Sequence, residues 1–149
     1  MHDIQLTTHF RLSEFLRSET ASARGIDNTP SLEVVSNLQQ LCIHVLEPLR
    51  AYFNTPIVVS SGYRSPALNK AVGGSATSQH MTGEAADLRI PSFEVGKKWF
   101  EYLKTLPHDQ LIWERDSHTS NHYWIHVSCR IDLNKNRNQC IPLLNKHSA

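Results

Sequence analysis

Apolar residues recur at steps of three and four positions in two segments near the start of the chain, which predicts two amphipathic helices. The first covers residues 10–24, and its inward positions are Leu12, Phe15 and Leu16. The second starts at Thr29-Pro30, a capping hydroxyl followed by proline at the first helical position. Its buried stripe consists of Val34, Leu38, Leu41, Val45 and Leu49. Pro48 predicts a kink or a break in this helix, because proline removes one backbone donor and crowds the preceding turn.

Four later segments have the composition or the alternation of β-strands. Residues 56–61 form a short β-branched run that is typical of a buried strand, and residues 85–90 alternate between two faces. Two more strands are predicted at 110–114 and 123–129, joined by a polar loop. The segment "KNRNQC", residues 135–140, is expected to be a solvated polar tail.

Two further helices separate these strands. One opens at Ser65-Pro66 and ends at Gly73-Gly74, and the other is capped by Ser92 and extends to about Thr105. The inward stripe of the second includes Phe93, Trp99, Phe100 and Leu103. This succession of helices, then mixed strands and helices, predicts an α+β fold with a small antiparallel sheet flanked by helices.

Length and composition limit the class of protein. The chain has 149 residues, of which 40% are hydrophobic, and we expect a single domain over residues 1–149 and a monomer. The formal charge is +1 with Lys and Arg spread along the chain, which excludes the basic footprint of a nucleic-acid binder. No stretch reaches the roughly 18 apolar residues of a membrane span. The N-terminus lacks the basic start and apolar stretch of a secretory signal, so we expect synthesis in the cytoplasm.

Three cysteines and nine histidines are candidates for metal binding. Cys42, Cys129 and Cys140 form no C-x-x-C pair, which excludes a four-thiolate zinc site. We expect Cys42 and Cys129 to be packing residues, and one disulfide stays open as an alternative. Six histidines follow no ligand spacing and are expected at the surface: His2, His9, His44, His108, His118 and His147.

The stretch "SQHMTGEAADL", residues 78–88, brings a histidine and a carboxylate close together around small residues. Asp87 alternates with apolar residues in its strand, and His126 does the same in the last strand. The two strands can therefore present both side chains on one open face, with His80 reaching in from the preceding turn. Two imidazoles and one carboxylate leave a fourth tetrahedral position for water, which is the arrangement of a catalytic zinc. Spacing and strand parity alone leave the metal site undecided.

The segment "SGYRSPALNKAVGGSATSQHMTGEAADL" (61–88), followed by "WIHVS" (124–128), resembles the zinc D-Ala-D-Ala carboxypeptidase-like family of peptidoglycan peptidases. The shared pattern is Ser-x-His, a short turn with Gly and Ala, an Asp, and a distant His on a strand. "LSEF", "NL", "PLR" and "SGYRS" match its small single-domain members. The resemblance covers about residues 10–137 and implies the hedgehog/D-Ala-D-Ala peptidase-like fold.

The resemblance implies one Zn²⁺ ion held by His80, Asp87 and His126. It also puts Arg64 at the position of an arginine that faces the substrate, where a fork of donors can bind a carboxylate or a developing oxyanion. A structural salt bridge is the alternative for Arg64. Ser78 matches the serine of the family, which is expected to support the site and the bound substrate rather than to attack.

The general base is a separate question, because it must lie within hydrogen-bond reach of the water whose proton it takes. Many relatives have a Glu or Asp three residues before the last histidine ligand, and this chain has Tyr123 there. Glu114 resembles the acidic residue of the subgroup and is our choice of base. His122 is the alternative, since a neutral imidazole can shuttle a proton, and Asp116 is a third candidate. Trp124 is expected either to wall the substrate groove or to pack against the sheet.

These residues predict a zinc-dependent peptidase that hydrolyses peptidoglycan stem peptides. The resemblance leaves open a D-Ala-D-Ala carboxypeptidase and an L-Ala-D-Glu endopeptidase of the endolysin type. Without a secretory signal, a phage or prophage lysin that reaches the cell wall after release fits better than a cytoplasmic muropeptide-recycling enzyme. The alternative class is a non-catalytic zinc module, either a cell-wall-binding part of a phage particle or a hedgehog-like structural domain.

Overall fold

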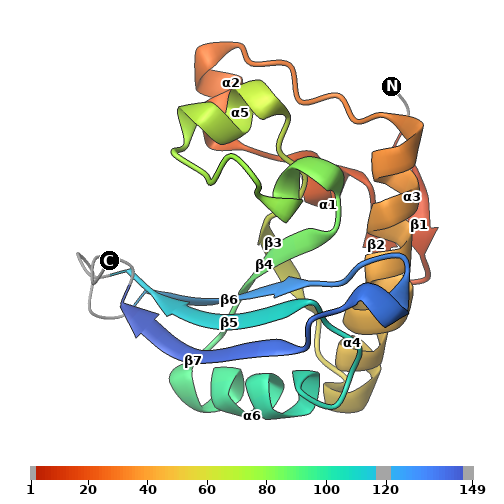
Figure 1. Ribbon diagram of the computed structural model, residues 1–149, viewed down its shortest axis with the longest axis vertical. Coiled ribbons are helices and arrows are strands. Elements are labelled where there is room, and N and C mark those ends of the chain that lie inside the picture. The colour runs from red at the N-terminus through yellow and green to blue at the C-terminus, as the bar shows by residue number, and fades with distance from the viewer. Residues whose placement is uncertain (1–2, 117–121, 146–149) are drawn as a thin grey trace.

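A computed structural model describes residues 3–116 and 122–145 of the chain (Figure 1). At its centre the described residues form a five-stranded sheet with the order β3-β4-β6-β5-β7. The strands are β3 (Val58–Ser61), β4 (Ala85–Arg89), β6 (Tyr123–Ser128), β5 (Gln110–Arg115) and β7 (Gln139–Asn145). Neighbouring strands are antiparallel except β5 and β7, which are parallel. The predicted α+β fold is confirmed, and the polar tail predicted at 135–140 is corrected, because its last residues begin β7.

Helices lie on both sides of this sheet, as Figure 1 shows. Below the sheet lie α4 (Glu47–Phe53) and α6 (Phe93–Leu103), and α3 (Leu32–Leu41) runs along one end of it. Above the sheet lie α1 (Ser13–Leu16), α2 (Glu19–Arg24) and α5 (Pro66–Ala71). The remaining described elements are the ribbon of β1 (Gln5–Thr7) and β2 (Phe10–Arg11), the π-helical turn η1 (Cys42–Leu46) and the 3-10 turns η2 (Gln79–Thr82) and η3 (Leu133–Lys135).

The core joins one face of the sheet to α3, η1, α4 and α6. Its sheet residues include Leu88, Leu111, Trp113, Ile125 and Val127, and its helical residues include Leu38, Leu41, Val45, Leu49, Trp99, Phe100 and Leu103. Burying each large apolar side chain of this kind contributes about 1.5–3 kcal/mol. The alternation predicted for the strands at 85–90 and 123–129 is therefore confirmed, and their polar positions face away from this core.

The prediction of a single helix over residues 10–24 is wrong. The segment forms β2, α1 and α2, and Arg17 adopts an extended backbone conformation between the two helices. Ser18 then caps α2 by accepting a hydrogen bond from the Ala21 N–H at 3.2 Å. Of the predicted inward residues, Leu12 and Phe15 are buried and Leu16 is half-buried.

The long helix is present, but its start and its middle differ from the prediction. It begins at Leu32, where Ser31 accepts a hydrogen bond from the Val34 N–H, so Pro30 precedes the helix instead of opening it. Pro48 neither breaks nor ends it. Because proline cannot donate a backbone hydrogen bond, the helix widens into the π-helical turn η1 just before Pro48 and continues as α4.

Two exposure predictions are also corrected. The strand predicted to be buried at 56–61 is β3, which lies at an edge of the sheet and leaves Val58 43% exposed. Phe93, predicted to face inward, is 48% exposed because it begins α6 near the end of the sheet. Its ring contacts those of Trp113 and Tyr123. The caps predicted at Ser65 and Ser92 are confirmed.

The histidines that were expected at the surface differ in how exposed they are. His9 is exposed and His44 is half-buried, whereas His108 is buried, and its Nδ1–H donates to the Leu106 carbonyl at 2.8 Å. Cys42 and Cys129 are buried free thiols, as predicted, and burial raises the pKa of the Cys42 thiol. Outside the described residues lie His2, His118 and His147.

A fully buried carboxylate, that of Asp109, attaches the start of β7 to the sheet. It accepts hydrogen bonds from the backbone and side chain of Arg137, at 2.7–3.2 Å, and from Gln79 Nε2 at 3.0 Å. Arg130 Nε forms an ion pair with the Asp109 carboxylate at 3.2 Å. The backbone carbonyl of Asp109 accepts a hydrogen bond from the Gln139 N–H. Burial alone would raise the pKa of this carboxyl, but the hydrogen bonds from Arg137 outweigh burial and hold the pKa well below its usual range.

We predict that Asp109→Asn lowers the free energy of unfolding at about pH 7 by about 2 kcal/mol, because charge-assisted hydrogen bonds to Arg137 are lost. The folded pKa of Asp109 lies below its unfolded value of about 3.9, so the stabilisation is present at neutral pH and is lost as the pH falls. Urea unfolding measures the difference in free energy of unfolding between wild type and variant, which should be about 1 kcal/mol smaller at pH 3 than at pH 7. A difference that is the same at both pH values would contradict this account.

The turn between η2 and β4 requires a glycine. Gly83 has φ +78°, in the left-handed region, and a Cβ atom there would lie 2.8 Å from the Val34 carbonyl oxygen of α3. The turn is therefore both left-handed and pressed against a helix. The sequence prediction that small residues let the chain fold tightly here agrees with this geometry.

Gly83→Ala should destabilise the protein by about 2–4 kcal/mol, from left-handed strain plus overlap with α3. Gly25→Ala is the matched control, because Gly25 has φ +63° but no atom within 4 Å of its added Cβ, so only about 1 kcal/mol is expected. Thermal unfolding of the two variants measures the difference, and equal losses would show that the contact with α3 contributes nothing.

Candidate metal centre

Three elements bring His80, Asp87 and His126 together. Asp87 on β4 lies directly opposite His126 on β6 in the antiparallel register, so both side chains project from the same face of the sheet. His80 comes from η2, which precedes β4 and contacts it. His80 is buried, and the side chains of Asp87 and His126 are each 13% exposed. The three residues predicted from the sequence therefore meet at one point above the sheet.

The spacing of their ligand atoms suits one small metal ion. Asp87 Oδ1 lies 3.3 Å from His80 Nε2 and 3.0 Å from His126 Nδ1, and one ligand atom from each residue lies within 4.8 Å of the others. Tetrahedral ligands on bonds of about 2.0–2.2 Å are separated by about 3.3 Å. Two nitrogens and one carboxylate oxygen are also the ligand types that zinc prefers. The donor set and its spacing thus fit zinc.

Backbone groups fix the orientation of His80. Its Nδ1–H donates to the Gly62 carbonyl at 2.7 Å, which leaves Nε2 unprotonated and directed toward Asp87. A carbonyl partner on the far ring nitrogen is the usual way in which proteins orient a histidine ligand. The His80 carbonyl accepts from the Arg64 N–H, and the Ser78 hydroxyl caps η2 by accepting from the His80 N–H. Ser78 therefore supports the turn that positions His80, and it also lines the cavity.

The electrostatics of the site favour an ionised Asp87. Burial alone would raise the pKa of its carboxyl, but attraction to His80 and hydrogen bonding with His126 outweigh burial and hold the pKa well below its usual range. Arg64 Nη2 lies 3.6 Å from Asp87 Oδ2 and brings a permanent positive charge to the carboxylate. A metal ligand must be a carboxylate rather than a carboxylic acid, and this surrounding supplies that form.

A cavity of about 590 Å³ opens above the three candidate ligands. Arg64 lines it, held by hydrogen bonds from Nε to Ser61 Oγ at 3.2 Å and from Nη1 to Asn69 Oδ1 at 3.3 Å. Asn69 is buried and also donates to the Ser75 carbonyl, so it joins Arg64 to the loop that follows α5. Arg64 thus lines the cavity, as expected for a substrate-facing arginine, and also forms the ion pair that was the alternative prediction.

Glu114 and His122 lie in different places. Glu114 on β5 is 9% exposed and lines the cavity of the candidate ligands. It follows Ile112, which lies opposite His126, by two residues and therefore projects from the same face. His122 is exposed beside the Trp124 ring, with ring centroids 5.3 Å apart. Both of these rings line another cavity, and neither lines that of the candidate ligands.

Sequence reasoning missed several residues around the cavity. Gln79 lines the cavity and donates to Asp109. Arg130 and Arg137 line the same cavity. None of these three residues has a spacing to the candidate ligands that the sequence would reveal.

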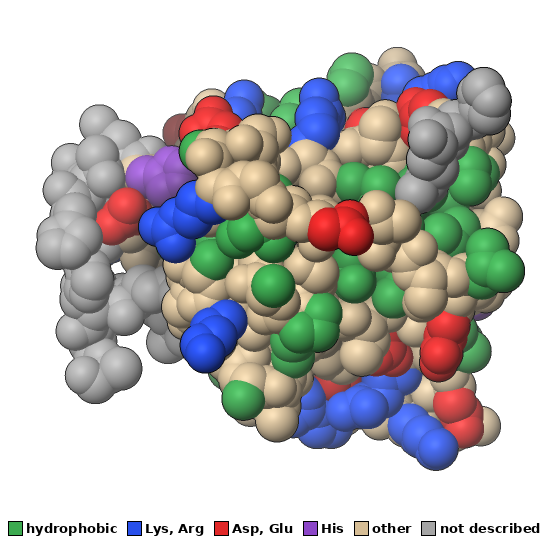
Figure 2. Space-filling model, turned by 90° about the horizontal axis from the view of Figure 1, so that it is seen from above, with side chains coloured by type: hydrophobic (Ala, Val, Ile, Leu, Met, Phe, Trp, Pro, Cys, Tyr) green, Lys and Arg blue, Asp and Glu red, His purple; other side chains and the backbone are tan. Residues whose placement is uncertain are grey.

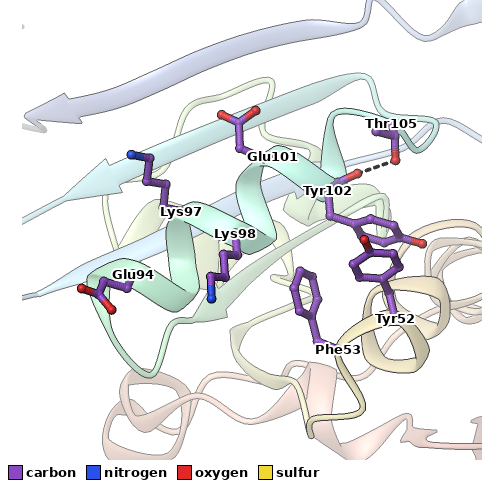
Figure 3. Close-up of a pocket in the computed structure, with 8 residues that line it drawn as sticks. All are labelled: Tyr52, Phe53, Glu94, Lys97, Lys98, Glu101, Tyr102 and Thr105. Carbon is purple, nitrogen blue, oxygen red and sulfur yellow. Dashed lines mark hydrogen bonds between the residues drawn. The ribbon is translucent and has the colours of Figure 1, made fainter.

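A larger cavity, of about 710 Å³, lies between α4 and α6 (Figure 3). The rings of Tyr52 and Tyr102 stack there with centroids 4.1 Å apart. Because α6 packs against Trp113 through Phe100, this cavity belongs to the side of the sheet opposite Glu114. Its described lining contains Lys and Glu side chains but no group of metal ligands.

The exterior offers few other signals. On the face drawn in Figure 2, acidic and basic side chains are interspersed, so no extended basic patch covers the described part of that face. Within residues 3–116 and 122–145, no helix has the length and apolar character needed to cross a bilayer.

Comparison with known proteins agrees with the geometry. A sequence model of the peptidase M15 family matches residues 8–128, a span that contains all three candidate ligands, Arg64 and Glu114. Members of that family are zinc-dependent peptidases. No curated protein matches the chain. Since the match covers most of the sequence, the chain belongs to the peptidase M15 family.

Proposed function

We propose that this protein is a zinc peptidase that hydrolyses peptide bonds in the stem peptides of bacterial peptidoglycan. The observation that supports it best is the meeting of two imidazoles and a carboxylate within 4.8 Å, beneath a cavity that Glu114 and Arg64 also line. When bound there, zinc would polarise the scissile carbonyl and lower the pKa of an attacking water toward about 7. The peptidoglycan substrate is inferred from the resemblance of "SQHMTGEAADL" and "WIHVS" to peptidoglycan peptidases.

The protein groups have separate tasks in this proposal. His80, Asp87 and His126 hold the metal, and the Gly62 carbonyl keeps His80 in the required tautomer. Glu114 accepts a proton from the attacking water and later delivers it to the leaving amine. Arg64 is already held by Ser61 and Asn69, so it can orient a substrate carboxylate or the carbonyl oxygen with little further ordering.

A non-catalytic zinc module is the second candidate. It would use the same three ligands but would need neither a base nor a substrate cavity. The position of Glu114 in the ligand cavity favours the peptidase, whereas His122 and Trp124 lie at a separate cavity and favour neither function.

The metal proposal predicts one zinc ion per chain, removable by a chelator. His80→Ala and His126→Ala should each lower zinc affinity at least about 100-fold, because a lost ligand costs at least as much as a lost supporting contact. Zinc should raise the free energy of unfolding of wild type by about 2.7 kcal/mol at 100 times the dissociation constant and should not stabilise these variants. His44→Ala, on η1, is the control, and its zinc content should equal that of wild type.

The base proposal predicts that Glu114→Gln retains zinc but lowers kcat by about 10²–10⁴-fold. The assay is the release of new amino termini from purified peptidoglycan of several chemical types by zinc-loaded protein. Glu101→Gln, on the exposed side of α6, is the matched control and should leave the rate unchanged. His122→Gln tests the alternative base. A fully active Glu114→Gln would exclude Glu114, and no cleavage of any wall type would favour the non-catalytic module.

A further inference from the structure

Arg130 brings to the cavity a guanidinium that contacts Asp109 through Nε. The side chain lines the cavity and is 38% exposed, and its backbone N–H donates to Asn136 Oδ1 at 2.9 Å. Its Nε is shielded from solvent and lies 3.2 Å from Asp109 Oδ1, but this contact lacks the geometry of a hydrogen bond. Nε is thus directed at Asp109. Within residues 3–116 and 122–145, Nη1 and Nη2 of Arg130 form no hydrogen bond, and they are the donors that a ligand in the cavity can reach.

Arg130 shares its carboxylate partner, Asp109, with Arg137, so two guanidiniums face one carboxylate and one positive charge is left over. Asp109 is the nearest carboxylate, and Arg137 already satisfies it with hydrogen bonds from Nε and Nη2 at 2.7–3.2 Å. The charged side chains at the cavity are Arg64, Arg130 and Arg137 on the basic side and Asp87 and Glu114 on the acidic side, with Asp109 behind them. With a divalent ion on the three ligands, positive charge exceeds negative charge by two. Such a cavity attracts an anionic substrate.

We propose that Arg130 binds a carboxylate group of the peptide substrate and thereby determines which bond is presented to the metal centre. This inference rests on the proposed peptidase function and deepens it. The planar fork of Arg matches a carboxylate in a bidentate arrangement. Asn136 holds the backbone N–H of Arg130 and Asp109 pairs with its Nε, so Arg130 is positioned before the substrate arrives.

The same chemistry occurs at two places in a stem peptide. One is the carboxylate at the C-terminus, whose binding would align the last peptide bond for a carboxypeptidase. The other is the free carboxylate of the D-Glu residue, whose binding would align an internal bond for an endopeptidase. Arg64 lines the same cavity and pairs with Asp87, whereas Arg130 pairs with Asp109, so Arg64 can orient the carbonyl while Arg130 holds the carboxylate.

The test uses three synthetic stem peptides that end in D-Ala-D-Ala: one with both carboxylates free, one amidated at the C-terminus and one amidated at D-Glu. For zinc-loaded wild type, one of the two amidations should lower kcat/KM by about 10- to 100-fold, the range expected for hydrogen bonds to a charged group. In Arg130→Gln the same amidation should change kcat/KM less than about threefold, because the partner of the carboxylate is already gone. Arg130→Lys should restore only part of the discrimination.

Arg50→Gln is the matched control, because Arg50 lies on α4, across the sheet from the cavity, and should retain the discrimination of wild type. All variants should contain equal amounts of zinc. The proposal is overturned if wild type treats the three peptides alike, or if Arg130→Gln slows all three by the same factor.

Binding measurements separate this proposal from the peptidase function. If zinc-loaded wild type cleaves none of the peptides, the dissociation constants of the same three peptides are compared by calorimetry in wild type and Arg130→Gln. A carboxylate dependence that is present only in wild type would support the Arg130 site while the peptidase proposal fails. Equal affinities throughout would reject the Arg130 site as well.

Discussion

The pairing of β4 with β6 is the interaction on which both the core and the candidate metal centre depend. In this pair Asp87 lies opposite His126, and Leu88 lies opposite Ile125. Because side chains alternate along each strand, the first pair faces the cavity and the second faces the core. A slip of one residue would drive the carboxylate and the imidazole into the core and expose two large aliphatic side chains. Burial of the core therefore fixes the register that brings the ligands together.

The elements that sequence predicts well are those whose signal lies within a few residues. Ser65 and Ser92 each accept a hydrogen bond from the N–H three residues later, so each cap is visible in its own turn. Parallel pairing of β7 with β5 has no such local signal, because the partner strand lies roughly thirty residues earlier and no turn joins them. Helical periodicity likewise could not show that the backbone straightens at Arg17 and that a second helix begins after it.

The candidate site likewise contains residues that the sequence predicts and residues that it does not. Strand alternation was enough to put Asp87 and His126 on one face, and the short turn before Asp87 brought in His80. The family resemblance then implied that the three residues bind zinc. The residues that support the cavity side chains could not be recognised from the sequence. Asn69 supports Arg64 through a side-chain contact, and Asp109 joins Gln79 to the start of β7 across 28 to 30 positions of sequence. Such contacts depend on tertiary packing and leave no periodic trace.

Two carboxylates of low exposure in this protein show how the chemistry of the partners separates a candidate metal ligand from a structural anchor. The pKa values of Asp87 and Asp109 are both lowered by their partners against the effect of burial. The hydrogen-bonding partners of Asp87 are imidazoles, which as neutral rings bind a metal through a free nitrogen.

The charged partners of Asp109 are guanidiniums, which stay protonated and have no lone pair to offer a metal. A metal ion beside Asp109 would meet two fixed positive charges and no nitrogen ligand. The same ion beside Asp87 would meet two imidazole nitrogens, with one guanidinium, that of Arg64, on the other carboxylate oxygen. Burial and a lowered pKa are thus shared by both carboxylates and do not identify the site. The identity of the neighbouring side chains separates them: it favours Asp87 as the candidate metal ligand of the proposed function, whereas Asp109 places Arg130 and Arg137 at the cavity wall.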